Sequence, residues 1–265
     1  MKKNRKLCFA IFLATEICFA LSSCVKKENA ENENALTIKD GILMIGTEYG
    51  SPPFEYLDSD GKTLIGFDVD LWNELCRRMN LVPQYFDTQW AGIFSGLEAR
   101  RYDCIISAVT ITKERKEKFL ITEPYVQNSE CFIVQKTNPA LIDSPDKLKN
   151  LKVAYQAETV SDVYVSELLL DGNQFKTFEY DKLMDAFDDL KFSRVDVVVA
   201  ESVAARNLVK ENPEVFRIDF IGEPDAFFGI LVNKSNSALF EKIQSILNQM
   251  YDDGFMKKIE DKWLK

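Results

Sequence analysis

Short apolar runs alternate with amphipathic segments along most of this chain, and that alternation limits the folds it can adopt. Phe67, Leu71, Leu75 and Met79 recur at every fourth residue with charged residues between them, which is typical of a helix with one buried face. We expect strands at 42–48, 83–87, 102–109, 151–156, 175–180, 195–201 and 227–233, and helices at 67–79, 91–101, 160–170, 182–193, 202–213 and 236–264. Strands separated by helices predict an α/β protein with parallel sheets covered on both faces.

One pattern occurs twice, as LEARRYDCIISAVT at 97–110 and DLKFSRVDVVVAES at 189–202. Each copy runs from a helix through a basic residue and an aspartate into an apolar strand that ends in polar side chains. The repetition predicts two similar lobes rather than one long sheet, although any β-α-β unit can produce such a match. Ligands of open α/β sheets bind beyond the carboxyl ends of the strands. Ser107 and Thr110 therefore mark the rim of one lobe, and Glu201 marks the rim of the other.

The segment ISAVTITKER at 106–115 carries an arginine in the first turn of a helix expected to begin near Thr112. A helix N-terminus offers unpaired N–H groups, and a guanidinium binds a carboxylate through two parallel hydrogen bonds. With Glu201 on the facing lobe, Arg115 would hold one end of a ligand that carries a carboxylate and an ammonium group, as an α-amino acid does. Alternatively, Arg115 is a solvated charge and Glu201 is an acid that complements a helix dipole.

Three further side chains are candidates for the same cleft. Trp90 precedes a helix and could form either a flat apolar wall for a ligand or part of the core. Glu48 ends the first strand, and the alternative for it is a surface charge. Ser51 lies in the turn-rich loop at 49–54 that follows this strand.

The first 24 residues have the pattern of an export signal. Four positive residues precede a mostly apolar stretch at 7–21, which is shorter than a typical membrane span. LSSC at 21–24 resembles a bacterial lipobox, which implies that Cys24 is lipidated and anchors the chain; a plain secretory signal with an incidental cysteine is the alternative. We expect a signal peptide at 1–23 and a lipidated flexible tether at 24–36, which is polar and low in complexity.

Charge and residue usage argue against several function classes. The net charge is −9, and no basic run lies outside the N-terminus, so nucleic acid is not an expected partner. The absence of histidine removes the commonest general base and the commonest zinc ligand, and we expect neither a metal nor a cofactor. Cys76, Cys104 and Cys131 are expected to be buried thiols, because an odd set in apolar settings does not form a disulfide framework.

Four segments resemble the bacterial extracellular solute-binding proteins of family three, which serve polar amino-acid ABC importers. GFDVDL at 66–71, followed by Leu75-Cys76 and Met79, matches the family signature. ISAVTITKER at 106–115, GTEYGSPPFEY at 46–56 and YDDGFMKKIEDKWL at 251–264 resemble three further family segments.

The resemblance spans about residues 40–264 and implies a two-lobed periplasmic-binding-protein fold of type II. Each lobe would be a central sheet flanked by helices. Lobe 1 would comprise 37–131 and 223–265, and lobe 2 would comprise 132–222. Two hinge strands would join them, one near 131–135 and one near 220–230.

The resemblance also implies a role for each cleft residue. The implied contacts are Thr110, Arg115, Thr159 and the amide of Val160 for the ligand carboxylate, Ser107 and Glu201 for the ammonium group, and Trp90 for stacking on the ligand.

Some positions depart from the family pattern. Val160 stands where the family often has a threonine, and Glu201 is one methylene longer than the usual aspartate. Ser51 replaces a frequent aromatic residue, so the side-chain pocket is expected to be less enclosed than in relatives. Glu48 matches an acid that meets the distal cation in binders of basic amino acids.

These observations predict a substrate-binding lipoprotein of an amino-acid ABC importer, and not an enzyme. It would be a monomer that captures a polar amino acid, with Glu48 favouring a basic one. Its other partners would be the ABC permease with its ATPase subunits, and the membrane through Cys24, with the domain in the periplasm or extracytoplasmic space. The alternatives are an exported dehydratase for prephenate-like acids on the same fold, and a sensory module that reports to a membrane receptor.

Overall fold

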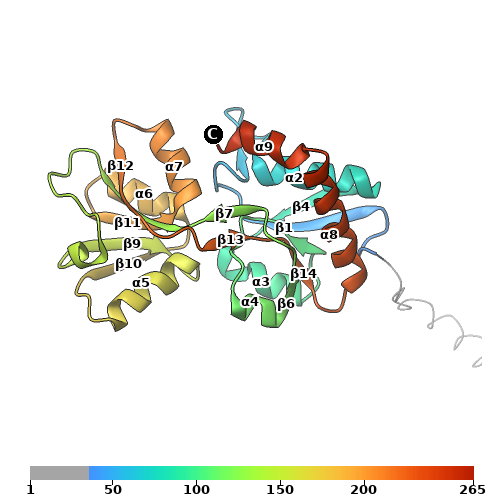
Figure 1. Ribbon diagram of the computed structural model, residues 1–265, viewed down its shortest axis with the longest axis horizontal. Coiled ribbons are helices and arrows are strands. Elements are labelled where there is room, and N and C mark those ends of the chain that lie inside the picture. Colours follow the sequence, from blue (N-terminus) through green and yellow to red (C-terminus); the bar gives the residue numbers. More distant parts are fainter. Residues whose placement is uncertain (1–35) are drawn as a thin grey trace, which may run out of the picture. The chain divides into compact units, whose positions relative to one another are not determined.

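Residues 36–265, which the computed structural model describes, build two five-stranded sheets (Figure 1). In order across the first sheet lie β4 (Val82–Asp87), β1 (Ile42–Thr47), β5 (Cys104–Ile105), β14 (Leu231–Asn233) and β6 (Phe119–Ile121). In order across the second lie β10 (Lys176–Tyr180), β9 (Lys152–Gln156), β11 (Val197–Glu201), β8 (Glu130–Gln135) and β12 (Phe216–Ile221). Each sheet is the centre of one lobe.

Helices cover both faces of the first sheet. On one face Leu43 and Ile45 share a core with α2 (Phe67–Met79), α8 (Ser237–Asp252) and α9 (Phe255–Trp263). On the other face Ile105 and Leu231 pack with α3 (Trp90–Glu98). Because helices cover both faces, β1, β5, β14 and β6 are apolar at nearly every position, whereas the edge strand β4 is largely exposed. A hairpin of β2 (Tyr56–Leu57) and β3 (Leu64–Ile65) and the short helix α4 (Lys113–Lys118) complete this lobe.

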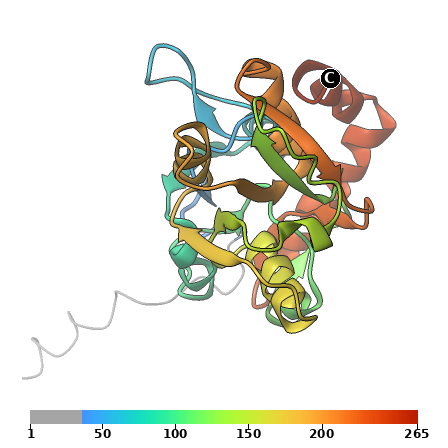
Figure 2. The ribbon, with the colours of Figure 1, turned by 90° about the vertical axis from the view of Figure 1, so that its left-hand side faces the viewer.

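The second sheet is covered in the same way. Ala154 and Val198 face a core formed with α6 (Leu183–Lys191) and α7 (Ser202–Glu211), whereas Val153 and Val199 face α5 (Val160–Leu170). Figure 2 shows α5 on one side of the strands and α6 and α7 on the other. A single 3-10 turn, η1 (Pro145–Leu148), precedes β9.

The chain passes between the lobes twice. β7 (Val126–Asn128) and β13 (Ala226–Phe228) pair as an antiparallel two-stranded ribbon, with Val126 opposite Phe228. The two crossing segments remain side by side beyond the ribbon, since the amide of Gly222 donates to the carbonyl oxygen of Glu130 over 2.8 Å. The segment at 131–135, implied as a hinge strand by the family resemblance, lies within β8.

The prediction of parallel sheets is wrong in part, because both sheets are mixed. β14 runs antiparallel to β5 and β6, and β8 runs antiparallel to β11 and β12. A parallel neighbour requires a crossover from within the same lobe. β8 and β14 instead follow directly from the ribbon that links the lobes, and they enter their sheets in the opposite direction.

Three predicted elements are interrupted. The strand expected at 227–233 is divided at Gly229 into β13 and β14, and only Cys104–Ile105 of the strand expected at 102–109 is regular. Ala108 has a φ of 44°, which a strand cannot accommodate. The helix expected at 236–264 ends at Asp252 and restarts after Gly254, whose φ is 81°. Strands β6 and β7 were not predicted, because three-residue strands carry little periodic signal. Strand β12 was also missed, although its sequence FRIDFI alternates between apolar and charged residues.

The three cysteines beyond the N-terminal segment follow the prediction. Cys76, Cys104 and Cys131 are buried and free. Burial raises the pKa of the Cys76 thiol to about 12, so this side chain packs as an apolar group. The predicted signal peptide, the predicted lipidation site Cys24 and all but the last residue of the predicted tether lie outside the described residues.

Candidate functional site

Polar residues at strand ends and helix starts of both lobes surround a small cavity of about 50 Å³. Six of the nine residues predicted to bind a ligand line it: Glu48, Ser51, Trp90, Ser107, Thr159 and Glu201. The other three predicted residues, Thr110, Arg115 and Val160, are outside this lining, although Thr110 contacts Glu201 directly.

Glu48 follows β1 and is buried, so its interpretation as a surface charge is wrong. Its Oε1 accepts a hydrogen bond from the amide of Trp90 over 2.9 Å, and its Oε2 accepts from Nε2 of Gln156 over 2.8 Å. Gln156 ends β9 in the second lobe, so Glu48 links the two lobes. Burial raises the pKa of Glu48, and the two hydrogen bonds oppose that shift.

The hydroxyl of Ser107 is fully used within the first lobe. Its Oγ accepts from the amide of Glu48 over 3.0 Å and donates to Oε1 of Glu55 over 2.8 Å. A serine hydroxyl has one proton to donate, so the side chain of Ser107 braces the end of β5. The carbonyl group of Ser107 is then the better candidate for contact with a ligand.

Thr110 and Glu201 join the lobes through the shortest of the contacts across the cavity. Oγ1 of Thr110 donates to Oε1 of Glu201 over 2.5 Å. Burial raises the pKa of Glu201 to about 7, while the Thr110 hydroxyl and the positive charge of Arg115 oppose the shift. Glu201 is therefore poised to exchange its proton near neutral pH, and any cation that enters the cleft favours its ionised form.

A second acid beside Glu201 was missed from the sequence. Burial and the charge of Glu201 raise the pKa of Glu130 to about 8. Oε2 of Glu130 accepts from the hydroxyl of Ser161 over 2.6 Å, whereas Oε1 is buried without a partner in residues 36–265. Glu130 begins β8 after an unpredicted strand, so the sequence offered no signal that it lies near the cleft.

Arg115 points toward the cleft side of the first lobe. Thr112 caps α4 by accepting from the amide of Arg115, and NH1 of Arg115 donates to the carbonyl oxygen of Thr110 over 2.8 Å. The guanidinium carbon lies 4.7 Å from the ring centre of Phe94 and 5.4 Å from that of Trp90. Burial lowers the pKa of Arg115 and the charge of Glu201 opposes that shift.

Within residues 36–265, no carboxylate lies at ion-pair distance from the Arg115 guanidinium. The guanidinium is thus held by a carbonyl oxygen and two aromatic rings, and none of its N–H donors is paired with an acid of residues 36–265. The interpretation of Arg115 as a solvated surface charge is wrong, because its side chain is packed against these rings.

Trp90 and Thr159 face each other across the cavity. Trp90 is buried, begins α3, and donates from Nε1 to the carbonyl oxygen of Glu158 in the second lobe over 2.9 Å. Thr159 caps α5: its Oγ1 accepts from the amide of Asp162 and donates to the carbonyl oxygen of Gln156 over 2.7 Å. Val160 is the first residue of that helix, where amide groups lack partners within the helix.

Six residues that line the cavity were not predicted: Phe54, Ala108, Gln156, Leu183, Ala204 and Phe228. Gln156 directly follows the apolar part of β9, so the rule that ligand-binding residues lie at the carboxyl ends of strands could have identified it. The apolar members have no such signal, because they resemble ordinary core residues.

The two lobes are closed on each other in this structure. Three hydrogen bonds cross the cleft, from Thr110 to Glu201, from Gln156 to Glu48 and from Trp90 to the carbonyl oxygen of Glu158. The enclosed volume of about 50 Å³ is far below the roughly 300–1,000 Å³ of a small-molecule pocket. A ligand of ordinary size can therefore enter only when the lobes move apart.

Residues 43–265 match the family model of the bacterial extracellular solute-binding proteins, family 3. The chain belongs to this family. The two-lobed type II periplasmic-binding-protein fold predicted from the sequence is confirmed, because solved two-lobed proteins share it.

Three known proteins illustrate the similarity. The L-cystine-binding protein TcyJ of Escherichia coli strain K12 is 28% identical over 84% of this chain and 82% of its own length. An ancestral arginine-binding protein bound to arginine is 34% identical, with a TM-score of 0.80 over 85% of this chain and 99% of that structure. The ancestral amino-acid-binding protein AncCDT-1, a precursor of cyclohexadienyl dehydratase, is 29% identical, with a TM-score of 0.79 over 85% of this chain and 96% of that structure.

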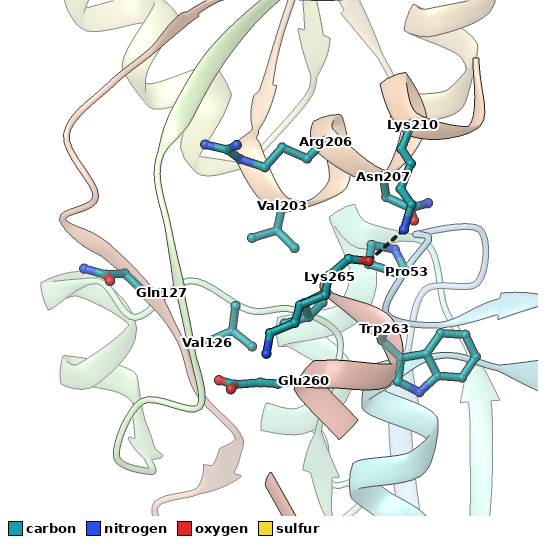
Figure 3. Close-up of a pocket in the computed structure, with 11 residues that line it drawn as sticks. Pro53, Val126, Gln127, Val203, Arg206, Asn207, Lys210, Glu260, Trp263 and Lys265 are labelled. Atoms are coloured by element: carbon teal, nitrogen blue, oxygen red, sulfur yellow. Dashed lines mark hydrogen bonds between the residues drawn. The ribbon is translucent and has the colours of Figure 1, made fainter. Parts of the chain in front are cut away.

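A second, larger cavity of this solute-binding protein lies behind the ribbon of β7 and β13 (Figure 3). Its volume is about 530 Å³. Val126 of the ribbon lines this rear cavity, whereas Phe228, its partner across the ribbon, lines the cleft cavity. The ribbon therefore borders both cavities.

The rear cavity is bordered by both lobes. Val203 comes from α7 of the second lobe, and Trp263 comes from α9 of the first. Nζ of Lys210 donates to the carbonyl oxygen of Lys265 over 2.7 Å, which is the hydrogen bond drawn in Figure 3. A rotation about the ribbon that opens the cleft would bring these rear surfaces closer together.

Neither a metal cluster nor a membrane-spanning helix is found in the described part of the chain. In residues 36–265, no three or more Cys, Asp or Glu side chains converge as a metal-binding group. No helix among these residues combines the length and the apolar character that crossing a bilayer requires.

Proposed function

We propose that this protein captures an amino acid in the cleft between its lobes and delivers it to an ABC importer. The observation that carries the proposal is the arrangement around Thr110. Its hydroxyl contacts Glu201 of the second lobe, and its carbonyl oxygen holds the guanidinium of Arg115. The carboxylate of Glu201 and the guanidinium of Arg115 therefore meet beside Thr110, between the lobes. The first can bind an α-amino group and the second an α-carboxyl group.

The ligand carboxylate would bind to Arg115 and to the start of α5. Arg115 is packed against Phe94 and Trp90 and lacks a carboxylate partner among the described residues, so its planar fork is free to pair. The hydroxyl of Thr159 is used in capping. The amides of Thr159 and Val160 at the positive end of the helix would supply further donors.

The ligand ammonium group would bind to Glu201 and to the carbonyl oxygen of Ser107. Ligand entry would replace the hydrogen bond from Thr110 to Glu201 with one from the ammonium group. An ammonium charge beside Glu201 would also lower its raised pKa and keep it ionised. Ser51 lines the cavity and would leave room for a long ligand side chain.

We propose a basic amino acid as the preferred ligand, with arginine first. Glu48 would meet the distal cation, which would compete with Gln156 for Oε2. The ligand carboxylate would neutralise the charge of Arg115. Glu201 and Glu48 would neutralise the two positive groups of a basic amino acid, its α-ammonium group and its distal cation. The similar ancestral protein was solved with arginine bound, whereas TcyJ binds L-cystine, so cystine is the main competitor.

Binding would require the lobes to open and close. We propose that residues 37–131 with 223–265 form lobe 1 and that 132–222 form lobe 2. They would rotate about the two crossing segments beside the β7–β13 ribbon. The closed form, which carries contacts from both lobes, would be the form that the permease and its ATPase subunits recognise. The protein would act as a monomer, held at the membrane surface by lipid on Cys24.

A thermal-shift screen of residues 25–265, freed of bound ligand, tests the proposal. A ligand that binds only the folded state raises the melting temperature, by an amount that grows with concentration. We expect arginine to give the largest shift among the common amino acids, cystine and opines, and we expect Arg115→Ala to abolish it. No shift with any amino acid would reject the proposed function.

An enzyme is the second candidate, because Glu201 and Glu130 have pKa values near neutral. An acid that holds its proton near neutral pH can protonate a leaving group, and the similar AncCDT-1 is a precursor of cyclohexadienyl dehydratase. Incubation with prephenate or arogenate would yield an aromatic product if this activity is present. Without such a product, the dehydratase candidate fails.

A further inference from the structure

Two carboxyl groups lie together in the interior of the first lobe, directly beneath the cleft. Gly66 lets the start of α2 approach the loop before β2, where the amides of Phe67 and Asp68 donate to the carbonyl oxygens of Pro53 and Phe54. This contact brings Asp68 within hydrogen-bonding reach of the Glu55 side chain. Both acids are completely inaccessible to solvent.

The hydrogen bonds around the two acids identify which of them carries the negative charge. Oδ2 of Asp68 accepts from the amide of Ala108 over 2.8 Å and from the hydroxyl of Tyr125 over 3.0 Å. Oε1 of Glu55 accepts a single hydrogen bond, from Ser107. Two donors stabilise an anion more than one does, so Asp68 is the better site for the charge.

The remaining oxygens of the pair are unusual. Oε2 of Glu55 and Oδ1 of Asp68 are buried and have no donor among residues 36–265. The described residues also place no lysine or arginine at ion-pair distance from either acid. Two unpaired anions in contact within a dry interior are not sustainable, because each costs several kcal/mol of desolvation and each repels the other.

We propose that Glu55 and Asp68 share one proton, which sits on Oε2 of Glu55 and is donated to Oδ1 of Asp68. The bridge gives both orphaned oxygens a partner and reduces the charge of the pair to −1. It also fixes the direction of the neighbouring hydrogen bonds. Since Oε1 of Glu55 can only accept, Ser107 donates to it and must accept from the amide of Glu48.

The bridge positions the floor of the cleft. Ala108 lines the cavity and has a φ of 44°, a conformation that L-residues rarely adopt without support. The charge on Asp68 supports it by accepting from its amide. Ser107, whose carbonyl oxygen is a proposed ligand contact, is held by Glu55. Glu55 and Asp68 are therefore positioning residues for the binding site.

The charged and titratable groups around the pair agree with this assignment. Burial raises the pKa of Glu55 well above its ordinary value, and the charges of Asp68 and Glu48 raise it further. Burial raises the pKa of Asp68 to about 6, and the contact with Glu55 opposes this shift, whereas the contact with Asp68 adds to the rise of the Glu55 pKa, which is the direction expected when Glu55 carries the proton. Tyr125, the other titratable group in contact, has a pKa raised by burial and remains a donor to Asp68.

Isosteric amide substitutions test the shared proton. In Glu55→Gln or Asp68→Asn, an N–H group takes the place of the proton and donates to the remaining carboxylate, so both single variants should fold. In the double variant, two amide groups must satisfy the same set of partners, and two N–H donors meet. If the two substitutions acted independently, their effects on the unfolding free energy would add. We expect the folding equilibrium constant of the double variant to be at least about tenfold lower than this additive expectation.

Infrared spectroscopy supplies a signature that a merely structural role would not change. The parent protein at neutral pH should show the C=O stretch of a protonated carboxylic acid, and the part of this band that comes from Glu55 should be missing from the spectrum of each single variant. Asp103→Asn is the matched control. Asp103 is also buried, but its oxygens accept from the amides of Ile38 and Met44, so its replacement should leave the band unchanged.

The pH dependence of stability gives a third readout. The pKa of Glu55 is raised in the folded state, so its contribution is fully present below pH 4.5 and is lost as pH rises toward the folded value. Glu55→Gln should remove this slope, which is at most about tenfold in the folding equilibrium per pH unit. Equal bands in the parent protein and both single variants, or a double variant no worse than the sum, would overturn the shared proton.

The effect on ligand affinity rests on the proposed function and is measured separately. We expect the double variant to bind arginine at least about tenfold more weakly than Glu55→Gln, because Ser107 and Ala108 lose their support. If the infrared and stability results hold but the parent protein binds no amino acid, the shared proton stands and the proposed function fails.

Discussion

The hydroxyl of Thr110 in the first lobe donates a hydrogen bond to the Glu201 carboxylate in the second lobe, with 2.5 Å between the oxygens. Each residue is thus the nearest partner of the other in the closed form. A ligand ammonium group that binds Glu201 must displace Thr110 or share the carboxylate with it. The strength of this contact therefore contributes to the free energy that separates the empty closed form from the loaded one.

We predict that acidification below about pH 7 weakens amino-acid binding. The pKa of Glu201 is raised to about 7 in the folded protein, so below that pH the side chain is neutral and cannot balance an ammonium charge. Affinity should fall by up to about tenfold per pH unit below this value and level off above it. Calorimetry across this range measures the effect, and an equally steep profile for Glu201→Gln would assign it to another group.

The same shift has the opposite consequence for the empty protein. Because the folded pKa of Glu201 exceeds its ordinary value of 4.5, its contribution to stability is complete below 4.5 and disappears as pH rises through about 7. Protonation of Glu201 at low pH thus stabilises the empty protein and weakens ligand binding.

Arg115→Ala should reduce affinity by about 2–5 kcal/mol, or roughly 30-fold to several thousand-fold, because the ligand carboxylate would be left without its charged partner. Arg115→Lys should recover part of the loss, since it restores the charge but not the planar fork. Lys116→Ala is the matched control, because Lys116 is an exposed neighbour in α4. Wild-type affinity in Arg115→Ala, measured by calorimetry, would contradict the role given to the guanidinium.

Glu48→Gln should weaken arginine and lysine binding by about 1–3 kcal/mol more than glutamine binding. The substitution keeps the size of the side chain and removes the charge that would meet a distal cation. The substitution replaces one acceptor oxygen by an NH2 group, so the contact with either Trp90 or Gln156 is lost; this loss affects all ligands alike and cancels in the ratio of affinities. If calorimetry gives the same loss for all three ligands, a cationic preference does not originate at Glu48.

Val203→Trp should raise the affinity for ligand by about threefold or more. The rear cavity of about 530 Å³ can hold an indole ring when the cleft is closed, but opening would press that ring against the first lobe. The population of the closed form should therefore rise, and apparent affinity rises with it. Val163→Trp, on an exposed face of α5, is the control. Unchanged affinity in Val203→Trp would argue against rotation about the ribbon.

Gly66→Ala should destabilise the fold by at least about 3 kcal/mol. Gly66 has a φ of 138°, and an added Cβ would lie 1.9 Å from the carbonyl oxygen of Phe54. Gly92→Ala in α3 should instead be neutral or stabilising by about 1 kcal/mol, since its nearest neighbour would be 3.8 Å away. Urea denaturation compares the two variants. Similar unfolding free energies would show that the loop beside α2 can move to accommodate the added methyl group, which would contradict this prediction.

Local sequence determined the elements that have strong periodicity or clear caps. The helix at Phe67–Met79 was predicted with its observed bounds, and the helix that carries Arg115 begins after the predicted Thr112. The repeated strand with polar residues at its end correctly predicted two lobes with Ser107 and Glu201 at their rims. These features depend on neighbours within a few residues, and a single sequence contains that information.

Tertiary structure alone decided the direction of β8 and β14, the break at Gly229, and the meeting of Glu130 with Glu201 and of Glu55 with Asp68. Each depends on segments that are distant in sequence and are brought together by burial. The same applies to charge: Glu48, Glu55 and Glu201 are ordinary acids in the sequence. Their pKa values are raised because the packed lobes remove water from around them.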